Sequence, residues 1–489
     1  MMFEIDRDYK TSINIFVIAM FIICCSKLTS FHNTIQNFHI CALLINSKIN
    51  SGNRLPLFLI NNGKINQKIY KASYILWYMI NLTIFNRHWE KNFFYNIPKK
   101  RDLYNTIIRF LPKKYIISIV GLRRTGKTTI MKQLIDNLVE QKIKRYGILF
   151  YSFDEPNELN EVINEYIKLS AKEIGKDTIY FFLDEIQKLK NWQEKIKIYY
   201  DNYPNLKFII SGSSSLFMKK SESLAGRIAE FELEPLSFKE FLLFKGKQNL
   251  MENRKLFAEK LKEECESYLL RQFIEIINED TETIKWYVES LARKIIFEDI
   301  PAVYPIEQPQ VLLKLLKIIS STPGMLIDYK HLASDIKINE KTLSNYVEFM
   351  EQAYLFYKTY NFSRNLLTSE KKLKKEYLKT TSFCISEIKE TAKLIENCII
   401  AQTKTKFFWR ENLEVDAVIV QDKKILPVEI KYKNEIKPKE IKGIIKFMEK
   451  FKIKKGIIIT KNNEKRRNNL VFIPAWKFLL NKDNLNDIV

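Results

Sequence analysis

Three runs of apolar residues predict buried strands in the first half of the chain. Residues 115–120, 179–183 and 206–210 are rich in isoleucine, phenylalanine and leucine, with few polar interruptions. Such runs are typical of parallel strands covered by helices on both faces, because neither face meets water. Residues 129–138 follow the first run and carry apolar residues at helical spacing, which predicts a helix. The pattern therefore favours an α/β domain built on a parallel sheet.

The turn between the first strand and this helix fits a phosphate-binding loop. Residues 121–128 read Gly-Leu-Arg-Arg-Thr-Gly-Lys-Thr, the G-x-x-x-x-G-K-[ST] pattern of a P-loop. A strand, a tight turn and a helix N-terminus gather backbone N–H groups and the positive end of a helix dipole, which suits a triphosphate. These flanks, and a total of only 12 glycines in 489 residues, argue against a chance match. We predict an ATP site formed by Gly121, Leu122, Arg123, Arg124, Thr125, Gly126, Lys127, Thr128 and Thr129.

The chemistry of this site follows from the side chains at three predicted strand ends. We expect Lys127 to reach the β- and γ-phosphates and Thr128 to ligate the Mg²⁺ that bridges them. Asp184 and Glu185 end the second strand, at the edge where open α/β sheets bind ligands. Asp184 is expected to hold Mg²⁺ through water, and Glu185 to polarise the attacking water as a general base; a solvated acidic turn is the alternative. Ser211 ends the third strand and is either a sensor of the γ-phosphate or part of a simple Gly/Ser turn.

The order of these motifs resembles a prokaryotic family of ATPases of the AAA+/STAND type. The matching segments are residues 121–128, 183–187, 211–214, 224–227 and 236–241. Members carry a P-loop domain, a winged helix and a C-terminal restriction-endonuclease-like domain. The resemblance implies that Ser211 is a sensor residue and that Arg227 is a catalytic arginine finger or sensor arginine, in its own chain or in a neighbouring subunit. Paired guanidinium donors suit the charge on a transferring phosphoryl group; from the residues alone, Arg227 is a surface arginine after a small-residue turn.

The resemblance also implies a domain organisation. We expect an N-terminal extension (1–84), a P-loop ATPase domain (85–245), a helical subdomain (246–308), a winged-helix-like domain (309–368) and a restriction-endonuclease-like domain (369–489). The family usually shows a glycine-rich turn near the end of its ATPase module, whereas residues 268–277 hold no glycine, which leaves the local structure there open. The highly charged residues 369–376 are interpreted as a solvated helix face or loop, and as a domain boundary.

Two short helices in the middle of the chain predict a helix-turn-helix. Residues 311–320 carry a helical apolar stripe, a Ser-Thr-Pro-Gly turn follows, and residues 326–335 and 341–351 form the predicted pair. In this interpretation the recognition helix begins with residues that face a major groove, Lys341, Thr342, Ser344 and Asn345. The alternative is a helical module that binds protein or only packs between domains.

The C-terminal region contains a D…E-x-K pattern. Asp416 lies in one apolar run, and Glu429 and Lys431 end the next, where a period of two places them on the same strand face. Glu396 lies upstream in a predicted helix over residues 392–400. The pattern resembles a PD-(D/E)xK nuclease core, which implies Mg²⁺ ligation by Asp416 and Glu429, assistance from Glu396, and charge stabilisation or water orientation by Lys431. The alternative is an alternating strand with a solvated charged face.

The net charge bears on the class of binding partner, and the cysteines bear on the cellular compartment. The formal net charge of +23 indicates attraction to an anionic polymer, DNA rather than RNA in our interpretation, although a Lys-, Ile- and Asn-rich composition also fits an AT-rich genome. Six cysteines without a C-x-x-C pair predict reduced, buried thiols in a cytoplasmic protein. The apolar residues 13–25 are shorter than the roughly 20 residues that span a bilayer, so a membrane anchor is disfavoured.

Together these features predict a Mg²⁺-dependent ATPase that couples its nucleotide state to a DNA-binding and nuclease-like module. Nuclease activity and homo-oligomer formation remain open. Two alternatives stand beside this prediction: a non-cleaving, ATP-dependent switch or regulator acting on nucleic acid, and a membrane-tethered ATPase acting on a protein partner.

Overall fold

The computed structural model describes residues 82–213, 224–388, 390–421 and 424–482. The chain divides into two units between residues 87 and 88. The apolar residues 13–25 and three of the cysteines lie outside the described residues. No helix in the described ranges combines the length and the apolar character needed to cross a membrane. Cys265, Cys384 and Cys398 are free and buried, as the sequence predicts.

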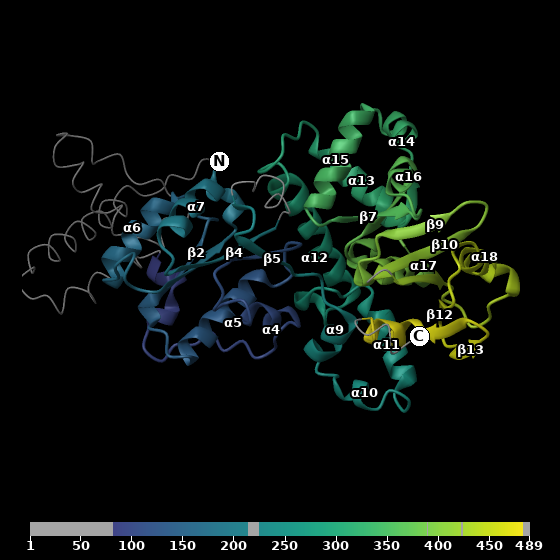
Figure 1. Ribbon diagram of the computed structural model, residues 1–489, viewed down its shortest axis with the longest axis horizontal. Helices are drawn as coiled ribbons and strands as arrows, with labels where there is room; N and C mark the ends of the chain where they lie inside the picture. Colours follow the sequence, from purple (N-terminus) through teal and green to yellow (C-terminus); the bar gives the residue numbers. More distant parts are fainter. Residues whose placement is uncertain (1–81, 214–223, 389, 422–423, 483–489) are drawn as a thin grey trace, which may run out of the picture. The chain divides into compact units, whose positions relative to one another are not determined.

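A five-stranded sheet forms the first half of the second unit, with strand order β2-β3-β4-β1-β5 (Figure 1). Every neighbouring pair is parallel. The strands are β1 (Ile116–Val120), β2 (Ile148–Ser152), β3 (Ile179–Asp184), β4 (Leu206–Gly212) and β5 (Ile228–Glu232). The three strands predicted from apolar runs are confirmed as β1, β3 and β4, and the parallel α/β fold is confirmed with them.

Helices cover both faces of this sheet. Figure 1 shows α4 and α5 on one face and α6 and α7 on the other. Their bounds are α4 (Leu103–Ile108), α5 (Lys127–Glu140), α6 (Leu159–Ser170) and α7 (Trp192–Asn202), with short 3₁₀ turns η2 (Arg87–Trp89), η3 (Arg145–Gly147) and η4 (Ile186–Lys188). The predicted helix over residues 129–138 is α5, which begins two residues earlier, directly after the glycine of the loop.

A group of helices follows β5. It consists of α9 (Phe238–Phe244), α10 (Asn249–Glu252), α11 (Ala258–Tyr268), η6 (Ile274–Ile276) and α12 (Thr281–Lys294), which continues as the π-helical turn η7 (Ile295–Asp299). A capping box begins α9: the Ser237 hydroxyl accepts from Glu240 N, and the Glu240 carboxylate accepts from Ser237 N. The segment without glycine, residues 268–277, connects α11 to η6 in an ordered turn.

Four helices and a small antiparallel sheet come next. The elements are α13 (Pro309–Ser321), β6 (Met325–Ile327), α14 (Tyr329–Ile336), α15 (Glu340–Gln352), β7 (Phe356–Asn361), α16 (Leu366–Lys371) and β8 (Lys374–Leu378). The helices expected at residues 311–320 and 341–351 are confirmed. The helix expected at 326–335 begins only at Tyr329, because Asp328 caps it by accepting from His331 N and the residues before form β6, which pairs with β8.

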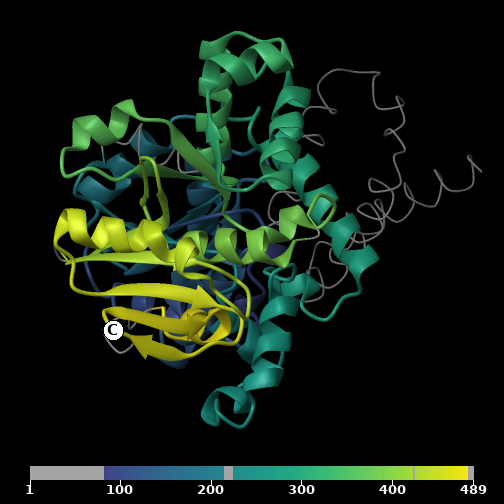
Figure 2. The ribbon, with the colours of Figure 1, turned by 90° about the vertical axis from the view of Figure 1, so that its right-hand side faces the viewer.

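The remaining strands extend this small sheet into a mixed sheet of nine strands, β13-β14-β12-β11-β10-β9-β7-β8-β6. Figure 2 shows its C-terminal strands in yellow. The link is a short parallel pairing between β7 and β9, with Tyr360 opposite Phe407. The added elements are η8 (Thr381–Cys384), α17 (Thr391–Thr403), β9 (Phe407–Arg410), β10 (Glu414–Gln421), β11 (Lys424–Ile430), η9 (Pro438–Ile441), α18 (Lys442–Phe451), β12 (Gly456–Thr460), β13 (Lys465–Arg467), β14 (Leu470–Pro474) and α19 (Ala475–Leu480).

The interpretation of residues 369–376 as a solvated face or loop is wrong for their second half. Lys375 and Glu376 lie on β8 and are buried, because this strand sits between β6 and β7. The long Lys375 side chain reaches the carboxylate of Glu414 on β10. Sequence alone missed this strand because its charged residues are buried. β8 pairs with β6 and β7, which precede residue 369. The expected domain limit between residues 368 and 369 stays a sequence-based prediction.

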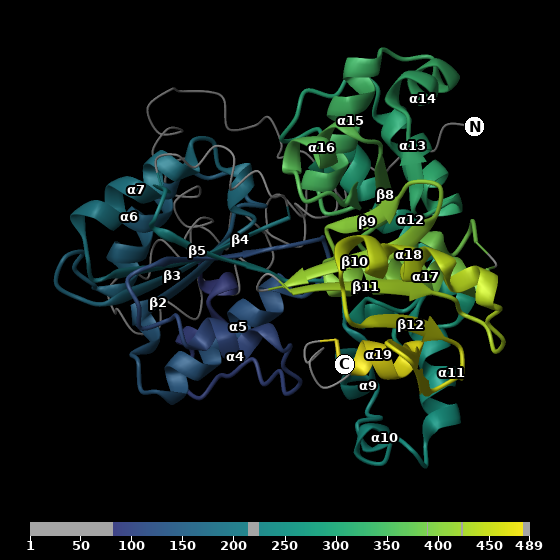
Figure 3. The ribbon, with the colours of Figure 1, turned by 45° about the vertical axis from the view of Figure 1, so that its right-hand side comes forward.

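The core of the C-terminal sheet lies between the sheet and α18 (Figure 3). Trp409, Val418, Phe447 and Phe451 are buried in it. Gly443 allows the close approach of the helix, since a Cβ at this position would lie 2.1 Å from the carbonyl oxygen of Glu414. The packing fixes β10 and β11, the two strands that carry the D…E-x-K residues.

Candidate functional site

The loop between β1 and α5 has the conformation of a phosphate cradle. Gly121 and Gly126 adopt φ angles of 141° and 98°, which side-chain-bearing residues rarely adopt. A Cβ at Gly121 would lie 2.3 Å from the Leu233 carbonyl oxygen, so only glycine fits there. The buried ammonium of Lys127 donates to the carbonyl oxygens of Gly121 and Leu122, at 2.9 and 3.0 Å, and burial lowers its pKa. The cradle suits the phosphates of a nucleotide.

Asp184 joins the ends of two strands and the start of α5 at this loop. Its Oδ2 accepts from the Thr128 hydroxyl at 2.6 Å, and its Oδ1 accepts from the Ser211 hydroxyl and from the backbone N–H of Glu185. Three predicted site residues from β3, β4 and α5 are therefore in direct contact. Hydroxyl and carboxylate oxygens side by side are the donors that Mg²⁺ prefers, so Thr128 and Asp184 fit that ion.

Glu185 lies beside Asp184 in a left-handed conformation, with φ of 50°. Burial raises the pKa of its carboxyl group. The amide nitrogen of Gln187 donates to Glu185 Oε2 and, at 3.2 Å, to the hydroxyl of Ser213 after β4. Gln187 therefore orients the proposed base. Sequence reasoning included Gln187 in a motif but gave it no role, because its side-chain direction depends on the turn.

Arg101 is a second residue that sequence reasoning missed. Its guanidinium donates to the Thr125 carbonyl of the loop at 2.7 Å, to both carboxylate oxygens of Glu240 at 2.8 and 3.0 Å, and to the Glu234 carbonyl at 2.7 Å. The side chain is buried. It links the loop to the end of β5 and to α9. Arg101 ends the basic run Lys99-Lys100-Arg101, and such a run is typical of a solvated surface. The sequence therefore gave no reason to expect a buried arginine here.

The two arginines inside the loop are held by carboxylates of the helical group. Arg123 donates to Asp299 at the end of η7, and Arg124 lies 3.8 Å from Glu275. Both side chains therefore form ion pairs within the protein. The predicted contact of Arg123 and Arg124 with the nucleotide would then be made by their backbone N–H groups. Sequence spacing gave no indication of these partners.

A cavity of about 330 Å³ opens beside the loop. Gly126 and Thr129 form one part of its wall, and Ile274 and Ile277, from the segment without glycine, form another. Its remaining lining residues are Ile97, Pro98, Lys99, Arg101, Gln133, Phe244 and Asn278. The mixture of aliphatic walls and amide groups next to a phosphate cradle suits the base and sugar of a nucleotide.

Arg227 lies at the end of the sheet opposite the loop of its own chain, which argues against the alternative in which it acts within that chain. It directly precedes β5, and its carbonyl accepts from the N–H of Ile116 at the start of β1. The loop follows the other end of β1, about 13 Å away along the strand. The Arg227 guanidinium is bound to Asp201, at 2.9 Å. A role toward a neighbouring subunit remains a prediction.

The D…E-x-K residues of the C-terminal sheet meet on β10 and β11. The Lys431 ammonium lies 2.6 Å from Glu429 Oε1 and 3.4 Å from Asp416 Oδ2. Asp416 also accepts from the backbone N–H of Ile430 at 2.7 Å. Burial and the nearby Asp416 raise the pKa of Glu429 to about 8. The period-two prediction that brings Glu429 and Lys431 together is confirmed.

The predicted three-carboxylate metal set is not formed. Glu396 on α17 is partly buried and accepts from the Tyr377 hydroxyl at 2.8 Å, and desolvation together with the charge of Asp416 raises its pKa to about 7. Among the described residues, no group of three or more His, Cys, Asp or Glu side chains is placed to hold a metal ion. Glu429 Oε2, however, is buried and has no hydrogen-bond partner there, so a pair of ligands, Asp416 and Glu429, still fits a divalent cation completed by water.

Comparisons with known proteins agree with the first of these sites. Residues 113–242 match a family described as an AAA domain. The chain carries an AAA-type P-loop ATPase domain. Residues 275–391 and 382–478 match two domains of unknown function, DUF8612 and DUF4143.

Relatives that match most of this chain occur in an archaeon. Two uncharacterized proteins of Methanocaldococcus jannaschii, MJ1637 and MJ1544, are 26% and 28% identical to the chain. The matches cover 79% and 78% of this chain, and 90% and 92% of the relatives. The similarity therefore extends well beyond the ATPase domain.

Solved structures that match parts of this chain include two ATPases. The Walker-type ATPase PABY2304 of Pyrococcus abyssi is 15% identical, with a TM-score of 0.38, and the match covers 62% of this chain and all of that one. A STAND protein of Pyrococcus horikoshii, PH0952, is 14% identical with a TM-score of 0.26, over 64% of this chain and 46% of that one. At these TM-scores no residue-by-residue correspondence follows.

Proposed function

We propose that the protein is a Mg²⁺-dependent ATPase that couples its nucleotide state to a nucleic-acid-binding, nuclease-like C-terminal region. The observation that carries the proposal is the contact of Thr128, Asp184 and Ser211 beside the buried ammonium of Lys127. Three separate elements bring oxygen donors and a cation to the phosphate cradle, which is the arrangement that phosphoryl transfer needs.

Each residue has a defined task in this proposal. Lys127 exchanges its two carbonyl acceptors for phosphate oxygens. Thr128 and Asp184 would hold Mg²⁺, which would neutralise charge on the phosphates. Glu185, with its raised pKa and its bond from Gln187, accepts a proton from the attacking water. Ser211 positions Asp184 by donating a hydrogen bond to it.

The end of β5 supports coupling between the nucleotide site and the C-terminal region. Leu233 donates its N–H to the Val120 carbonyl at 2.7 Å, just before the loop. The carboxylates on either side of Leu233 form ion pairs with lysines of the C-terminal region. Glu232 pairs with Lys379 at 2.6 Å, and Glu234 pairs with Lys404 at 2.9 Å. Lys379 follows β8 and Lys404 follows α17. A shift of the loop on nucleotide binding therefore has a direct covalent and ionic route into the second sheet.

The proposed nucleic-acid and nuclease functions rest on two surfaces. Lys341, Ser344 and Asn345 are exposed on the first turns of α15, where a winged helix contacts a major groove. On β10 and β11, Asp416 and Glu429 offer oxygen ligands, and Lys431 offers a cation for a scissile phosphate. The alternative is a regulator that binds nucleic acid without cutting it; the Glu396 position, outside a three-carboxylate set, favours this alternative.

The first experiment measures Mg²⁺-dependent ATP hydrolysis by the wild type and by Lys127→Ala, with and without double-stranded DNA. Lys142→Ala, an exposed lysine just after α5, is the control. We expect hydrolysis to be lost in Lys127→Ala, retained in Lys142→Ala, and raised by DNA. A wild type that neither binds nor hydrolyses ATP contradicts the central proposal, whereas hydrolysis indifferent to DNA directs the search to a protein or membrane partner.

A second experiment separates cleavage from binding. Supercoiled plasmid is incubated with Mg²⁺, ATP and either the wild type or Glu429→Ala, with exposed Glu435→Ala as the control. Nicking by the wild type and the control, but not by Glu429→Ala, supports a nuclease. Binding of the plasmid by all three without nicking supports the non-cleaving regulator.

A further inference from the structure

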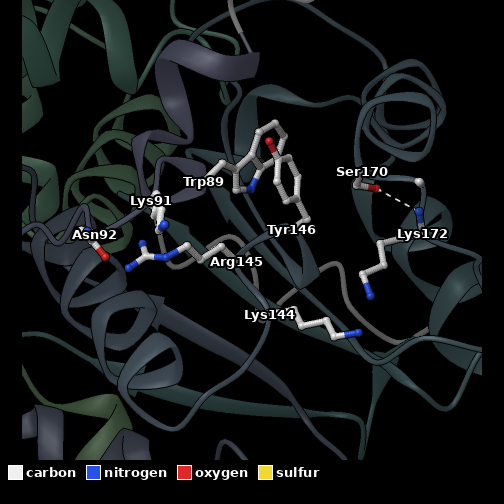
Figure 4. A pocket seen from close by; sticks show the side chains of 9 residues that line it. Trp89, Lys91, Asn92, Lys144, Arg145, Tyr146, Ser170 and Lys172 are labelled. Atoms are coloured by element: carbon white, nitrogen blue, oxygen red, sulfur yellow. Dashed lines mark hydrogen bonds between the residues drawn. The ribbon is translucent and has the colours of Figure 1, made fainter.

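A second cavity, of about 560 Å³, lies at the far edge of the ATPase sheet. Three short segments line it: Trp89, Lys91 and Asn92; Lys144, Arg145 and Tyr146; and Ser170, Ala171 and Lys172 (Figure 4). The second segment directly precedes β2, an outer strand of the sheet, and meets it at its amino end. The P-loop follows the carboxyl end of β1, so the cavity is separate from the proposed nucleotide site.

An aromatic platform forms part of the cavity wall. The Trp89 ring is buried and fixed in place, since its indole N–H donates to the Ile148 carbonyl at 2.7 Å. The Tyr146 ring packs against it, with a centroid distance of 5.3 Å and an interplanar angle of 31°. Tyr146 is 46% exposed, and Figure 4 shows the two rings side by side. The exposed ring is thus supported from behind and available for stacking.

Four cations surround this platform, and the nine lining residues include no carboxylate. Arg145 donates to the His88 and Phe93 carbonyls at 2.7 and 2.6 Å, which fixes its guanidinium without neutralising its charge. Lys172 is paired with Asp177 at 2.7 Å. Lys91 and Lys144 are exposed, and within the described part of the chain neither forms an ion pair. Asp177 also acts electrostatically on Lys144, and Asp136 acts on Arg145. These two carboxylates offset part of the charge of the four cations, and the surroundings of the cavity stay net positive.

We propose that this cavity binds single-stranded nucleic acid. A base stacks on Tyr146, while Lys91, Lys144 and Arg145 contact phosphates, a combination that single-strand-binding surfaces use. Cations that come from separate segments and surround a ring suit consecutive phosphates of a strand better than one isolated phosphate. The inference takes from the proposed function only the class of the partner, and it adds a binding site on the ATPase domain itself.

The test is fluorescence anisotropy of a labelled 20-nucleotide DNA strand, titrated with the full chain over a series of salt concentrations. We expect the Lys91→Ala/Lys144→Ala variant to bind at least about ten-fold more weakly and to reduce the salt slope by about 1.4, since each phosphate contact on a single strand contributes about 0.7. Tyr146→Ala is expected to weaken binding by about 5- to 150-fold with little change of slope, and Tyr146→Trp to restore it.

Two controls make the outcome decisive. Lys285→Ala/Lys439→Ala removes two exposed lysines elsewhere and is expected to bind the strand as the wild type does. Lys127→Ala is expected to retain strand binding, so that failure of the ATPase proposal and failure of this one are distinguishable. The inference is overturned if the wild type does not bind the strand, if the pocket double variant behaves like its control, or if a duplex of the same sequence binds more tightly and without dependence on Tyr146.

Discussion

The guanidinium of Arg123, inside the P-loop, donates to both carboxylate oxygens of Asp299, at 2.9 and 3.0 Å. Asp299 ends the π-helical turn that continues α12, so a residue 176 positions away restrains the loop. Both side chains are largely buried, at 16% and 14% exposure. Breaking such a pair leaves a charge in a place where water compensates poorly.

We therefore expect Asp299→Asn to destabilise the protein by about 1–3 kcal/mol, the cost of leaving a largely buried group without its partner, and to weaken ATP binding. The control lies in the same loop: the Arg124–Glu275 pair is 3.8 Å long and 59% and 40% exposed, so Glu275→Gln is expected to cost less than about 1 kcal/mol. Thermal unfolding and titration with a fluorescent ATP analogue measure both effects. Equal losses for the two variants would contradict a special role for Asp299.

Removing the Ser211 hydroxyl tests the contact that positions Asp184. Ser211→Ala is expected to raise the Mg²⁺ concentration needed for half-maximal hydrolysis by about ten-fold, as the loss of a group that orients a metal ligand commonly does. Ser118→Ala is the matched control, because this buried hydroxyl on neighbouring β1 has no hydrogen-bond partner among the described residues. A Mg²⁺ dependence unchanged in Ser211→Ala would rule out the positioning role.

Arg227 gives a prediction about assembly. If it completes the site of a neighbouring subunit, Arg227→Ala lowers hydrolysis roughly a thousand-fold or more, while Asp201→Asn, which removes only its ion-pair partner, has little effect. Mixing Arg227→Ala with Lys127→Ala then restores part of the activity, since one variant supplies an intact loop and the other an intact arginine. Activity that stays absent in the mixture, or that is insensitive to Arg227→Ala, excludes the role in trans.

Glu376 on β8 predicts how stability depends on pH. The carboxyl group is fully buried, both its oxygens lack hydrogen-bond partners in the described part of the chain, and burial raises its pKa well above the ordinary 4.5. The folded state therefore retains a proton that the unfolded state releases above about pH 4.5, so stability falls with rising pH, by up to about 1.4 kcal/mol per unit.

We expect Glu376→Gln to remove this dependence, so that its thermal midpoint exceeds that of the wild type by several degrees at pH 8 and matches it closely near pH 5. The exposed Glu370→Gln, on nearby α16, is expected to follow the wild type at both pH values. A midpoint difference between Glu376→Gln and the wild type that is the same at pH 5 and pH 8 would contradict the pKa shift.

The nucleotide site could largely be predicted from the sequence because most of its residues belong to short contiguous motifs. A P-loop between a strand and a helix fixes Lys127 and Thr128 by itself, and the parallel order of β1, β3 and β4 brings Asp184 and Ser211 to the same edge. The partners of Arg101 and Arg123 were out of reach, because Glu240 and Asp299 lie more than 130 residues away. Nothing in a basic run distinguishes a buried arginine from a solvated one.

The C-terminal region was harder for the same reason. Glu429 and Lys431 were placed correctly by strand alternation, which is a local rule. The strand β8 was missed because Lys375 and Glu376 are charged yet buried, and burial depends on β6, which lies about 50 residues earlier. Likewise, only the register of β5 against β1 reveals that Arg227 lies at the end of the sheet opposite the loop.

The pairing of Tyr360 with Phe407 joins two parts of the chain that sequence comparison treats as separate modules. Cutting the chain at residue 368 would remove β8 and β9 from β7 and leave hydrogen-bonding edges open on both fragments, which invites aggregation. Truncated forms of the chain therefore do better with a break before α13 than with one inside the nine-stranded sheet. Because β8, β7, β9, β10 and β11 are consecutive neighbours in one sheet, a displacement of Lys379, next to β8, also moves the strands that carry Asp416 and Glu429.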